Sequence, residues 1–337
     1  YCFLTAKLSK QAACLKFCRS QKIVAASWEV KMNSLEQALL EKVADLHTVP
    51  SGAYNIRKNG QLYDRGSTKE IEIRQKKNKS GIDIIVKKGV KNKSIHIPVI
   101  ITVGGINDLV YNDFYIGDDS DVFIVAGCGI HNKTCHDSIH NGVHSFHIGK
   151  NAKVKYVERH IGEGDGSGGK ILNPITNIYM KENSVMEIET TQLGGVSSTV
   201  RKTIATLGDG ATLHVQENLL TEDSQTAKTH FKVNLTGKNS SVEVVSHSVA
   251  KGKSHQEFLS DIIGKNECFG HVECDGILLD EARIVSTPMI DAADSRASLV
   301  HEAAIGKIAG DELIKLMTLG LSESEAEDMI IKGFLLG

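Results

Sequence analysis

The chain has 337 residues, of which 41% are hydrophobic and 5% aromatic, and its formal net charge is −2. This length and apolar content predict a globular protein with a substantial core, and the near-zero charge excludes a general electrostatic attraction to nucleic acid or to membrane surfaces. No run of eighteen apolar residues occurs, which excludes a membrane-spanning helix.

The seven cysteines are an odd number with uneven spacing, and no apolar signal sequence precedes them. We therefore expect reduced thiols and a cytoplasmic location rather than a disulfide framework. Residues 1–31 carry six basic residues against one acidic residue and hold three of the cysteines. They form an atypical N-terminal extension, for which three interpretations stay open: an upstream stretch included by mistake, an organellar transit peptide, or a small native helix.

Residues 32–109 are predicted to begin with one amphipathic helix. Ser34 and Gln37 have the spacing of a capping box. Apolar residues then recur at helical intervals as far as about His47. These residues are Leu35, Leu39, Val43 and Leu46.

The remainder of that segment, residues 55–103, alternates between apolar and polar residues and is rich in lysine. The dipeptides Asn59-Gly60 and Ser80-Gly81 interrupt the alternation, which indicates short antiparallel strands joined by hairpin turns. No aromatic residues interleave with the lysines, so solvent-facing lysines on edge strands are favoured over a nucleic-acid patch.

From about residue 110 a unit repeats: an aliphatic residue, a polar turn that usually contains Gly, a small residue, and an alternating strand. The turns begin at Gly117, Gly149, Lys181, Gly208, Gly237 and Gly264. The intervals are therefore 32, 32, 27, 29 and 27 residues. Repetition at such a period indicates a solenoid.

The repeats are rich in Val, Ile and Thr, and no helical stretch separates them. Stacked parallel strands are therefore favoured over helical repeats. We predict an all-β core in which residues 110–303 form a parallel β-helix with Gly and Asn at its corners. A β-sandwich with regular hairpins is the alternative.

One repeat contains two cysteines and five histidines within twenty residues. They are Cys128, His131, Cys135, His136, His140, His144 and His147. Thiolates beside imidazoles are ligands that zinc, copper or iron–sulfur species select. We predict that Cys128, His131, Cys135 and His136 close around one metal ion, iron or zinc, and that the other three histidines line a solvent-facing strand or turn.

A glycine-rich segment, residues 162–170, has the Gly164-x4-Gly169-Lys170 spacing of a phosphate-binding loop. Ile171 stands where Ser or Thr is needed for magnesium, and no helical pattern follows. We predict a corner loop without nucleotide chemistry.

The last segment, residues 304–337, is predicted to form two helices. Gly310-Asp311-Glu312 leads into the first, and Ser322 with Glu325 caps the second. An exposed solenoid end needs cover, so the pair either caps one end of the coil or docks a partner.

Four segments carry a family likeness: residues 254–258, 268–275, 300–308 and 319–326. With them the chain resembles the SUF-system scaffold family (SufB/SufD), and in outline its shorter archaeal and anaerobe-type branch. The resemblance covers roughly residues 33–337. It implies a right-handed parallel β-helix and a scaffold, not an enzyme, on which transient iron–sulfur clusters are assembled.

The resemblance also implies partners. These are an ABC-type ATPase that hydrolyses ATP, a second scaffold subunit, identical or paralogous, and a cysteine desulfurase system that donates sulfur. The ATPase would dock on the C-terminal helices, with Leu313, Leu316, Met317 and Leu321 as the contact residues. Neither nucleic acid nor membrane is implied.

Carried over residue by residue, the family motif assigns the cluster site to His301, Glu302 and Cys274. Cys268 is a further candidate, and a buried structural thiol is the alternative interpretation for it. Ala282 stands where the larger scaffold proteins have an acceptor cysteine. Sulfur would then be accepted by another thiol of this chain or by another subunit. The candidate thiols of this chain are Cys128, Cys135, Cys268 and Cys274.

Two rival functions remain: a metal-binding β-helix enzyme, and a β-solenoid that only binds other proteins. Sugar-cleaving β-helices use clustered carboxylates and are usually secreted, and neither feature is evident here.

Overall fold

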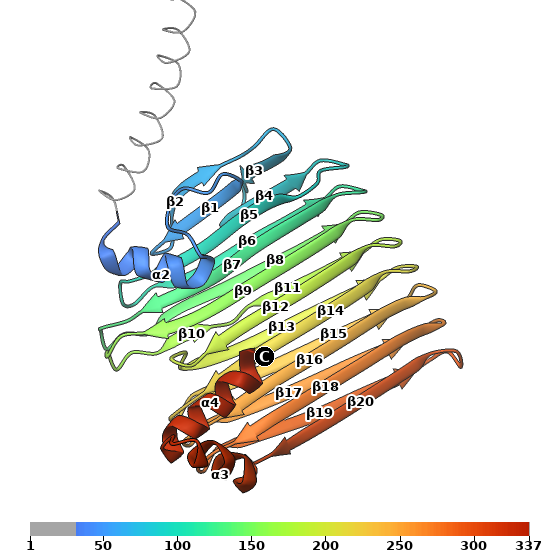
Figure 1. Ribbon diagram of the computed structural model, residues 1–337. Helices are drawn as coiled ribbons and strands as arrows, with labels where there is room; N and C mark the ends of the chain where they lie inside the picture. Colours follow the sequence, from blue (N-terminus) through green and yellow to red (C-terminus); the bar gives the residue numbers. More distant parts are fainter. Residues whose placement is uncertain (1–31, 337) are drawn as a thin grey trace, which may run out of the picture.

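The computed structural model describes residues 32–336, and the extension predicted for residues 1–31 lies outside this part of the chain. The described residues form a solenoid of stacked rungs whose two walls are β-sheets (Figure 1). The predicted parallel β-helix is confirmed, and the alternative of a sandwich built from hairpins is not. None of the helices in residues 32–336 has the length and apolarity needed to cross a bilayer.

Apart from the two N-terminal hairpins and one interrupted strand of sheet B, successive strands alternate between the two sheets, so each rung contributes to both walls. Sheet A has the spatial order β2 (Gln61–Gly66), β1 (Ala53–Lys58), β5 (Lys93–Ile101), β7 (Asp121–His131), β9 (Lys153–Glu163), β12 (Val185–Leu193), β14 (Thr212–Thr221), β16 (Ser240–Ala250), β18 (Cys268–Leu278) and β20 (Ser298–Gly306). Sheet B contains β3 (Ile71–Gln75), β4 (Gly81–Val86), β6 (Asn107–Ile116), β8 (Ser138–Ile148), β10 (Lys170–Leu172), β11 (Ile175–Met180), β13 (Ser198–Leu207), β15 (Thr226–Leu235), β17 (His255–Gly264) and β19 (Arg283–Ala292).

Inward side chains stack in apolar columns across the rungs. One column of sheet B contains Ile116, Ile148, Met180, Leu207 and Leu235, each at most 5% exposed. These residues begin the first five predicted repeats. In the sixth repeat Gly264 continues the column instead of Ile263, because the thiol of Cys268 and the methyl of Ala297 occupy the space beside it.

The corners of the solenoid explain the recurring Gly, Asn and Asp. Six stacked turn residues have left-handed backbone geometry with φ between 55° and 74°: Gly89, Asp119, Asn151, Asn183, Gly210 and Asn239. The N–H of each donates to a carbonyl of the following rung, for example Asp119 to Lys150 at 2.8 Å. Side chains with a bulky Cβ avoid this conformation, so the corner position selects Gly, Asn or Asp.

The parallel coil begins earlier than residue 110. Antiparallel pairing is restricted, in the described chain, to the two hairpins β1–β2 and β3–β4. Strand β5, expected to be antiparallel, pairs in parallel with β1 and β7. Its last five residues are all buried, because sheet A is covered here on its outer face as well as its inner one. A doubly covered strand loses the alternation on which the prediction depended.

The cover is helix α2 (Ser34–Ala44). Its capping box is formed by Asn33 and Glu36, one residue before the predicted pair, and Asp45 ends it in a left-handed conformation. Gly127 and Gly129 of β7 face the helix, and a Cβ on either would lie 3.1–3.2 Å from carbon atoms of Val43 or Leu39. The two glycines therefore permit the close approach of α2 to the sheet.

Helices α3 (Gly310–Thr318) and α4 (Glu323–Leu336) follow the last strand. Ser322 and Glu325 form the predicted capping interaction before α4. The helix packs through Ile331 and Leu335 against Val249, on the outer face of sheet A. The pair thus lies beside the sheet and does not cover the open end of the coil (Figure 1).

The glycine-rich segment forms a corner loop between β9 and β10, as predicted. A strand, and not a helix, follows Gly169. Lys170 donates to the carbonyl of Gly164 at 3.1 Å, so the lysine closes the loop on itself.

Candidate functional site

The middle rungs enclose a network of charged side chains. Arg201, 5% exposed, donates to Glu158 and lies 3.6 Å from Glu217. Glu217 also accepts hydrogen bonds from Thr229 at 2.9 Å and Ser246 at 3.0 Å. The network therefore pairs its buried charges, as burial in a low-dielectric interior requires.

The electrostatics of this network follow from burial and from Arg201. Burial alone would raise the pKa of Glu158, yet the charge of Arg201 holds that pKa well below its usual value. For Glu217 burial prevails, and its pKa is raised despite the same arginine. Burial lowers the pKa of His144 to about 4, so its imidazole is neutral at pH 7 and bonds to the hydroxyl of Tyr156 at 2.8 Å.

A second buried cluster lies nearer the N-terminal end. Asp108 accepts from Arg57 at 2.7 Å and lies 3.1 Å from the Nδ1 of His140. Burial would raise the pKa of Asp108, but the hydrogen bonds from His140 and Arg57 lower it. His140 and His144 are each 7% exposed, so the prediction that they face solvent is wrong. His147 is exposed, as predicted, and stacks between Tyr115 and Tyr179.

The thiol of Cys128 lies between these two clusters. It lines an interior cavity of about 20 Å³ together with His140, His144, Glu158 and His160. That volume is enough for about one water molecule. Burial raises the pKa of Cys128 well above its usual value, and nearby carboxylates raise it further, so the group is a thiol and not a thiolate.

The structure does not bring the four predicted metal ligands together. Cys128 faces the interior, whereas His131 is three residues along the same strand and faces outward, 3.8 Å from Glu163. Side chains alternate between the faces of a strand, so residues separated by three positions diverge. Cys135 and His136 lie exposed in the following loop.

The last two strands of sheet A, β18 and β20, contain the residues assigned through the family motif. Cys274 faces the interior from β18 and His301 does so from β20, where Val272 pairs with His301 and Cys274 with Ala303. Residues in adjacent strands with this diagonal offset have Cα atoms roughly 8 Å apart. The two side chains can therefore reach one shared iron ion or cluster.

Burial sets the protonation state of both groups. It raises the pKa of Cys274 to about 11 and lowers the pKa of His301, with the neighbouring His271 lowering it further. The Nε2 of His301 has no hydrogen-bond partner among residues 32–336. A neutral imidazole with a free nitrogen is the form that binds a metal.

Glu302 and Cys268 lie elsewhere. Glu302 follows His301 on β20 and points outward, 4.0 Å from the imidazole of His271. Cys268 faces the interior but is six residues from Cys274, which corresponds to about 20 Å along a strand. Within one subunit neither residue shares an ion with both Cys274 and His301.

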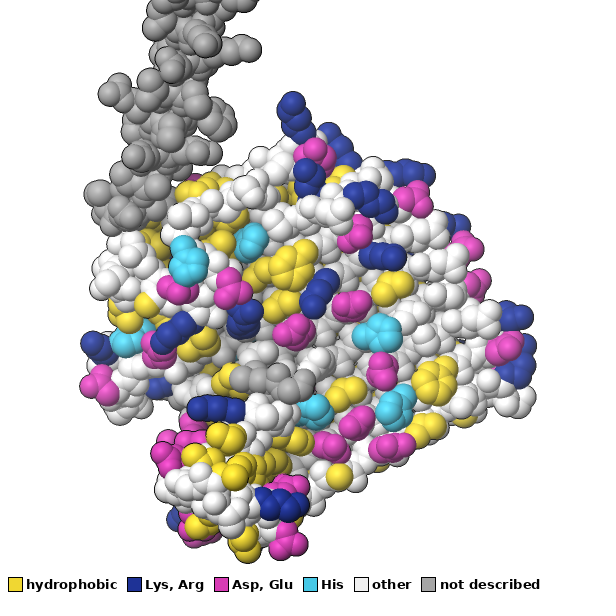
Figure 2. Space-filling model, in the orientation of Figure 1, with side chains coloured by type: hydrophobic (Ala, Val, Ile, Leu, Met, Phe, Trp, Pro, Cys, Tyr) yellow, Lys and Arg dark blue, Asp and Glu magenta, His cyan; other side chains and the backbone are white. Residues whose placement is uncertain are grey.

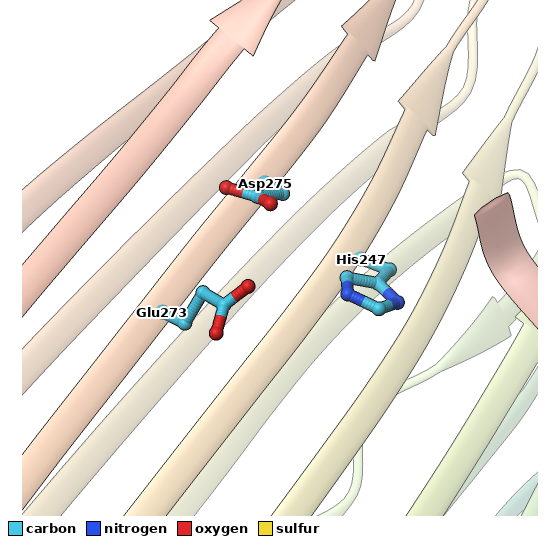
Figure 3. A group of neighbouring side chains, drawn as sticks. All are labelled: His247, Glu273 and Asp275. Carbon is cyan, nitrogen blue, oxygen red and sulfur yellow. The ribbon is translucent and has the colours of Figure 1, made fainter.

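Sequence reasoning missed a group of donors on the outer face of sheet A: His247, Glu273 and Asp275 (Figure 3). Their donor atoms all lie within 4.8 Å of one another. A signal was available, since His247 and Asp275 are 28 residues apart, which is one rung, and Glu273 and Asp275 share a strand face.

Comparisons with known proteins agree with the fold. Residues 112–334, about two-thirds of the chain, match the family described as SUF system FeS cluster assembly, SufBD core domain. An iron-sulfur cluster assembly SufBD family protein of Methanocaldococcus jannaschii is 29% identical over 270 residues, which are 79% of this chain and 84% of that protein.

Two further relatives carry the same family description. One from Pyrococcus horikoshii is 25% identical over 308 residues, 88% of this chain and 84% of that protein. A homologue from Methanothermobacter thermautotrophicus is 28% identical over 230 residues, 67% of this chain but only 54% of that protein. The chain therefore spans most of some relatives and about half the length of others.

Proposed function

This chain belongs to the SufBD family of SUF-system iron–sulfur cluster assembly proteins, and we propose that it is a cytoplasmic scaffold subunit on which a transient cluster is built between the adjacent strands β18 and β20. The observation that carries the proposal is the juxtaposition of Cys274 with His301 at the open end of the coil. One is a thiol, and the other is a neutral imidazole without a partner in the described chain.

Protonation governs how such a site loads. The Cys274 thiol retains its proton at neutral pH, so binding of iron or acceptance of sulfur must displace that proton. His301 needs no deprotonation, because its pKa is lowered by burial. We therefore expect the imidazole to bind iron first and the thiol to follow as its proton is released.

A second scaffold subunit completes this site in our proposal. Strands β19 and β20 are the last strands of their sheets, so each leaves one edge of backbone groups unpaired in the described chain. Apolar side chains exposed on these two strands are Met289 (44%), Ile290 (46%), Val300 (40%) and Ile305 (38%). Such an edge favours pairing with another chain. Glu302 faces outward and would then bind an ion together with side chains of the second subunit.

The ATPase partner is proposed to dock on α3 and the start of α4. Apolar side chains are exposed here on Ile314 (59%), Met317 (41%) and Leu319 (79%). Of the predicted contact residues, Met317 is exposed, whereas Leu313, Leu316 and Leu321 are partly buried. Motion of these helices on ATP hydrolysis would change the spacing of the facing rungs. The corresponding test is crosslinking between engineered cysteines on the two scaffold subunits, which should depend on nucleotide.

Anaerobic reconstitution tests the proposed site. The full chain is incubated with ferrous iron, cysteine and a cysteine desulfurase, and cluster formation is followed by visible absorption and by iron and sulfide analysis. We expect Cys274→Ser and His301→Ala to lose the cluster, and the exposed-thiol control Cys135→Ser to retain it. Equal cluster content in all four proteins would contradict the proposal, and iron bound without sulfide would favour a metal-binding enzyme.

A further inference from the structure

The outer face of sheet A presents imidazoles and carboxylates side by side. Figure 2 shows them interspersed on the face where α2 and α4 lie. Most are arranged as pairs, such as His214 and Glu243, whose atoms are 3.1 Å apart. His247, Glu273 and Asp275 differ, because three donors converge at one point of this face.

We infer that His247, Glu273 and Asp275 form a binding site for a divalent transition-metal ion, distinct from the Cys274–His301 pair. The register places His247 of β16 directly opposite Asp275 of β18, and Glu273 lies two residues earlier on the same face of β18. Cys274, between the two carboxylates, points to the other side of the sheet. The strand therefore separates the two sites.

The groups around this site leave its donors available. Neither Glu273 nor Asp275 forms an ion pair with any lysine, arginine or histidine in residues 32–336. One oxygen of Asp275 accepts the N–H of Ala304 at 3.2 Å, which fixes the carboxylate and leaves its second oxygen free. Uncompensated paired carboxylates repel each other, and a cation between them removes that repulsion.

His247 is oriented by a different contact. Its ring packs against Phe334 of α4, with ring centroids 4.9 Å apart and planes inclined by 34°. Among residues 32–336 its nitrogens have no hydrogen-bond partner, so they remain free to bind an ion. An aromatic wall that limits ring rotation reduces the entropy lost when the imidazole becomes a ligand.

Binding of an ion requires only a small movement of the three donor side chains. Ligand atoms about 2.1 Å from an ion lie roughly 3.0–3.4 Å from one another. The donors are now within 4.8 Å, and rotation of the flexible Glu273 side chain can close the remaining distance. One imidazole with two carboxylates suits manganese, ferrous iron or zinc, and it does not provide the all-oxygen shell that magnesium and calcium prefer.

The test is anaerobic titration of the full chain with Mn²⁺, Fe²⁺ and, separately, Mg²⁺, with free Mn²⁺ followed by electron paramagnetic resonance. It is repeated in a chain carrying Cys274→Ser and His301→Ala, which removes the proposed cluster ligands. We expect one Mn²⁺ or Fe²⁺ ion at this site in both proteins. Loss of that ion only in the second protein would assign it to the Cys274–His301 pair and overturn the inference.

Variants locate the ion. His247→Ala and Asp275→Asn should bind roughly 10- to 100-fold more weakly, whereas His214→Ala, which removes an imidazole from a neighbouring pair on the same face, should bind unchanged. Thermal unfolding without metal checks that each variant is folded, and added Mn²⁺ should raise the Tm of the wild type and of His214→Ala only. Unchanged affinity in folded His247→Ala, or equal losses in all three variants, would refute the site.

Discussion

Polar side chains lie in the interior both in the middle rungs and at the C-terminal end of the solenoid, but the two groups differ in how they are paired. Around Arg201 the buried charges pair with one another. At the C-terminal end of the coil the Nε2 of His301 has no hydrogen-bond partner within residues 32–336. Unpartnered side chains also occur in the middle rungs, at Thr190 and Gln192. The paired charges around Arg201 serve stability, whereas an unpartnered imidazole at an open end indicates a role in binding.

One row of inward residues links the two regions across sheet A. The register aligns Glu158, Thr190, Glu217, Ser246 and Cys274 on successive strands. The row begins with paired charges and ends with a thiol beside the open edge. The same wall therefore changes from a structural to a binding role over a few rungs. Substitutions around Arg201 should lower stability, whereas substitutions at the open end should reduce cluster binding with little effect on stability.

The largest effect on stability is expected for Arg201→Met. This change leaves Glu158 and Glu217 buried without their cation, and loss of one member of such a network destabilises a fold by about 3–5 kcal/mol. Urea unfolding monitored by circular dichroism measures the free energy of unfolding. The control Lys202→Met removes the same charge from an exposed neighbour. A loss below about 1 kcal/mol for Arg201→Met would contradict a stabilising pairing of Arg201 with Glu158 and Glu217.

The next effect concerns pH. The pKa of His144 is lowered to about 4 by burial, whereas an unfolded histidine titrates near 6.5. Between these values the unfolded chain binds the proton more readily, so stability is intact above about pH 6.5 and decreases as the pH falls towards 4, by about 3 kcal/mol in total.

Denaturation at a series of pH values in wild type and His144→Gln isolates this contribution. Glu158 and its neighbours titrate in both proteins, so the quantity to compare is the difference in slope between the two curves. The variant should lose up to about 1.4 kcal/mol per pH unit less than the wild type. Parallel curves would show that His144 is not held neutral.

An intermediate effect is expected at the open end. Ile305→Lys places a charge among the exposed apolar residues of the edge strand, and we expect self-association, or pairing with a paralogue, to weaken about tenfold or more. Sedimentation velocity measures the association. Val200→Lys is the matched control, because Val200 is 48% exposed on β13, in the wall away from the end. Equal behaviour of the two variants would place the interface elsewhere.

The smallest effect on stability is expected for His301→Ala. The side chain is only partly buried and its Nε2 has no partner in the described chain, so the free energy of unfolding should change by less than about 1 kcal/mol. Thermal and urea unfolding measure it. A much larger loss would show that the imidazole is a structural group, like those of the middle rungs.

The repeat was predictable because each corner needs a residue that adopts left-handed geometry, and Gly, Asn and Asp recur there at rung intervals. The inward histidines were not predicted, since half of the inward positions of β8 are polar and the apolar alternation is lost. Counting back in steps of two from Phe146 would have placed His144 and His140 inside. The pairing of Arg201 with Glu158 spans 43 residues and depends on register, which sequence patterns alone do not define.

In our proposal Cys274 and His301 hold the cluster between the last two strands of sheet A. The most direct test of this proposal is pulsed electron paramagnetic resonance of the reduced, anaerobically reconstituted protein labelled with ¹⁵N-histidine. We expect a strong hyperfine coupling to one imidazole nitrogen in the wild type and in Cys135→Ser, and its disappearance in His301→Ala. A cluster without imidazole coupling in the wild type, or the same coupling retained in His301→Ala, would contradict it.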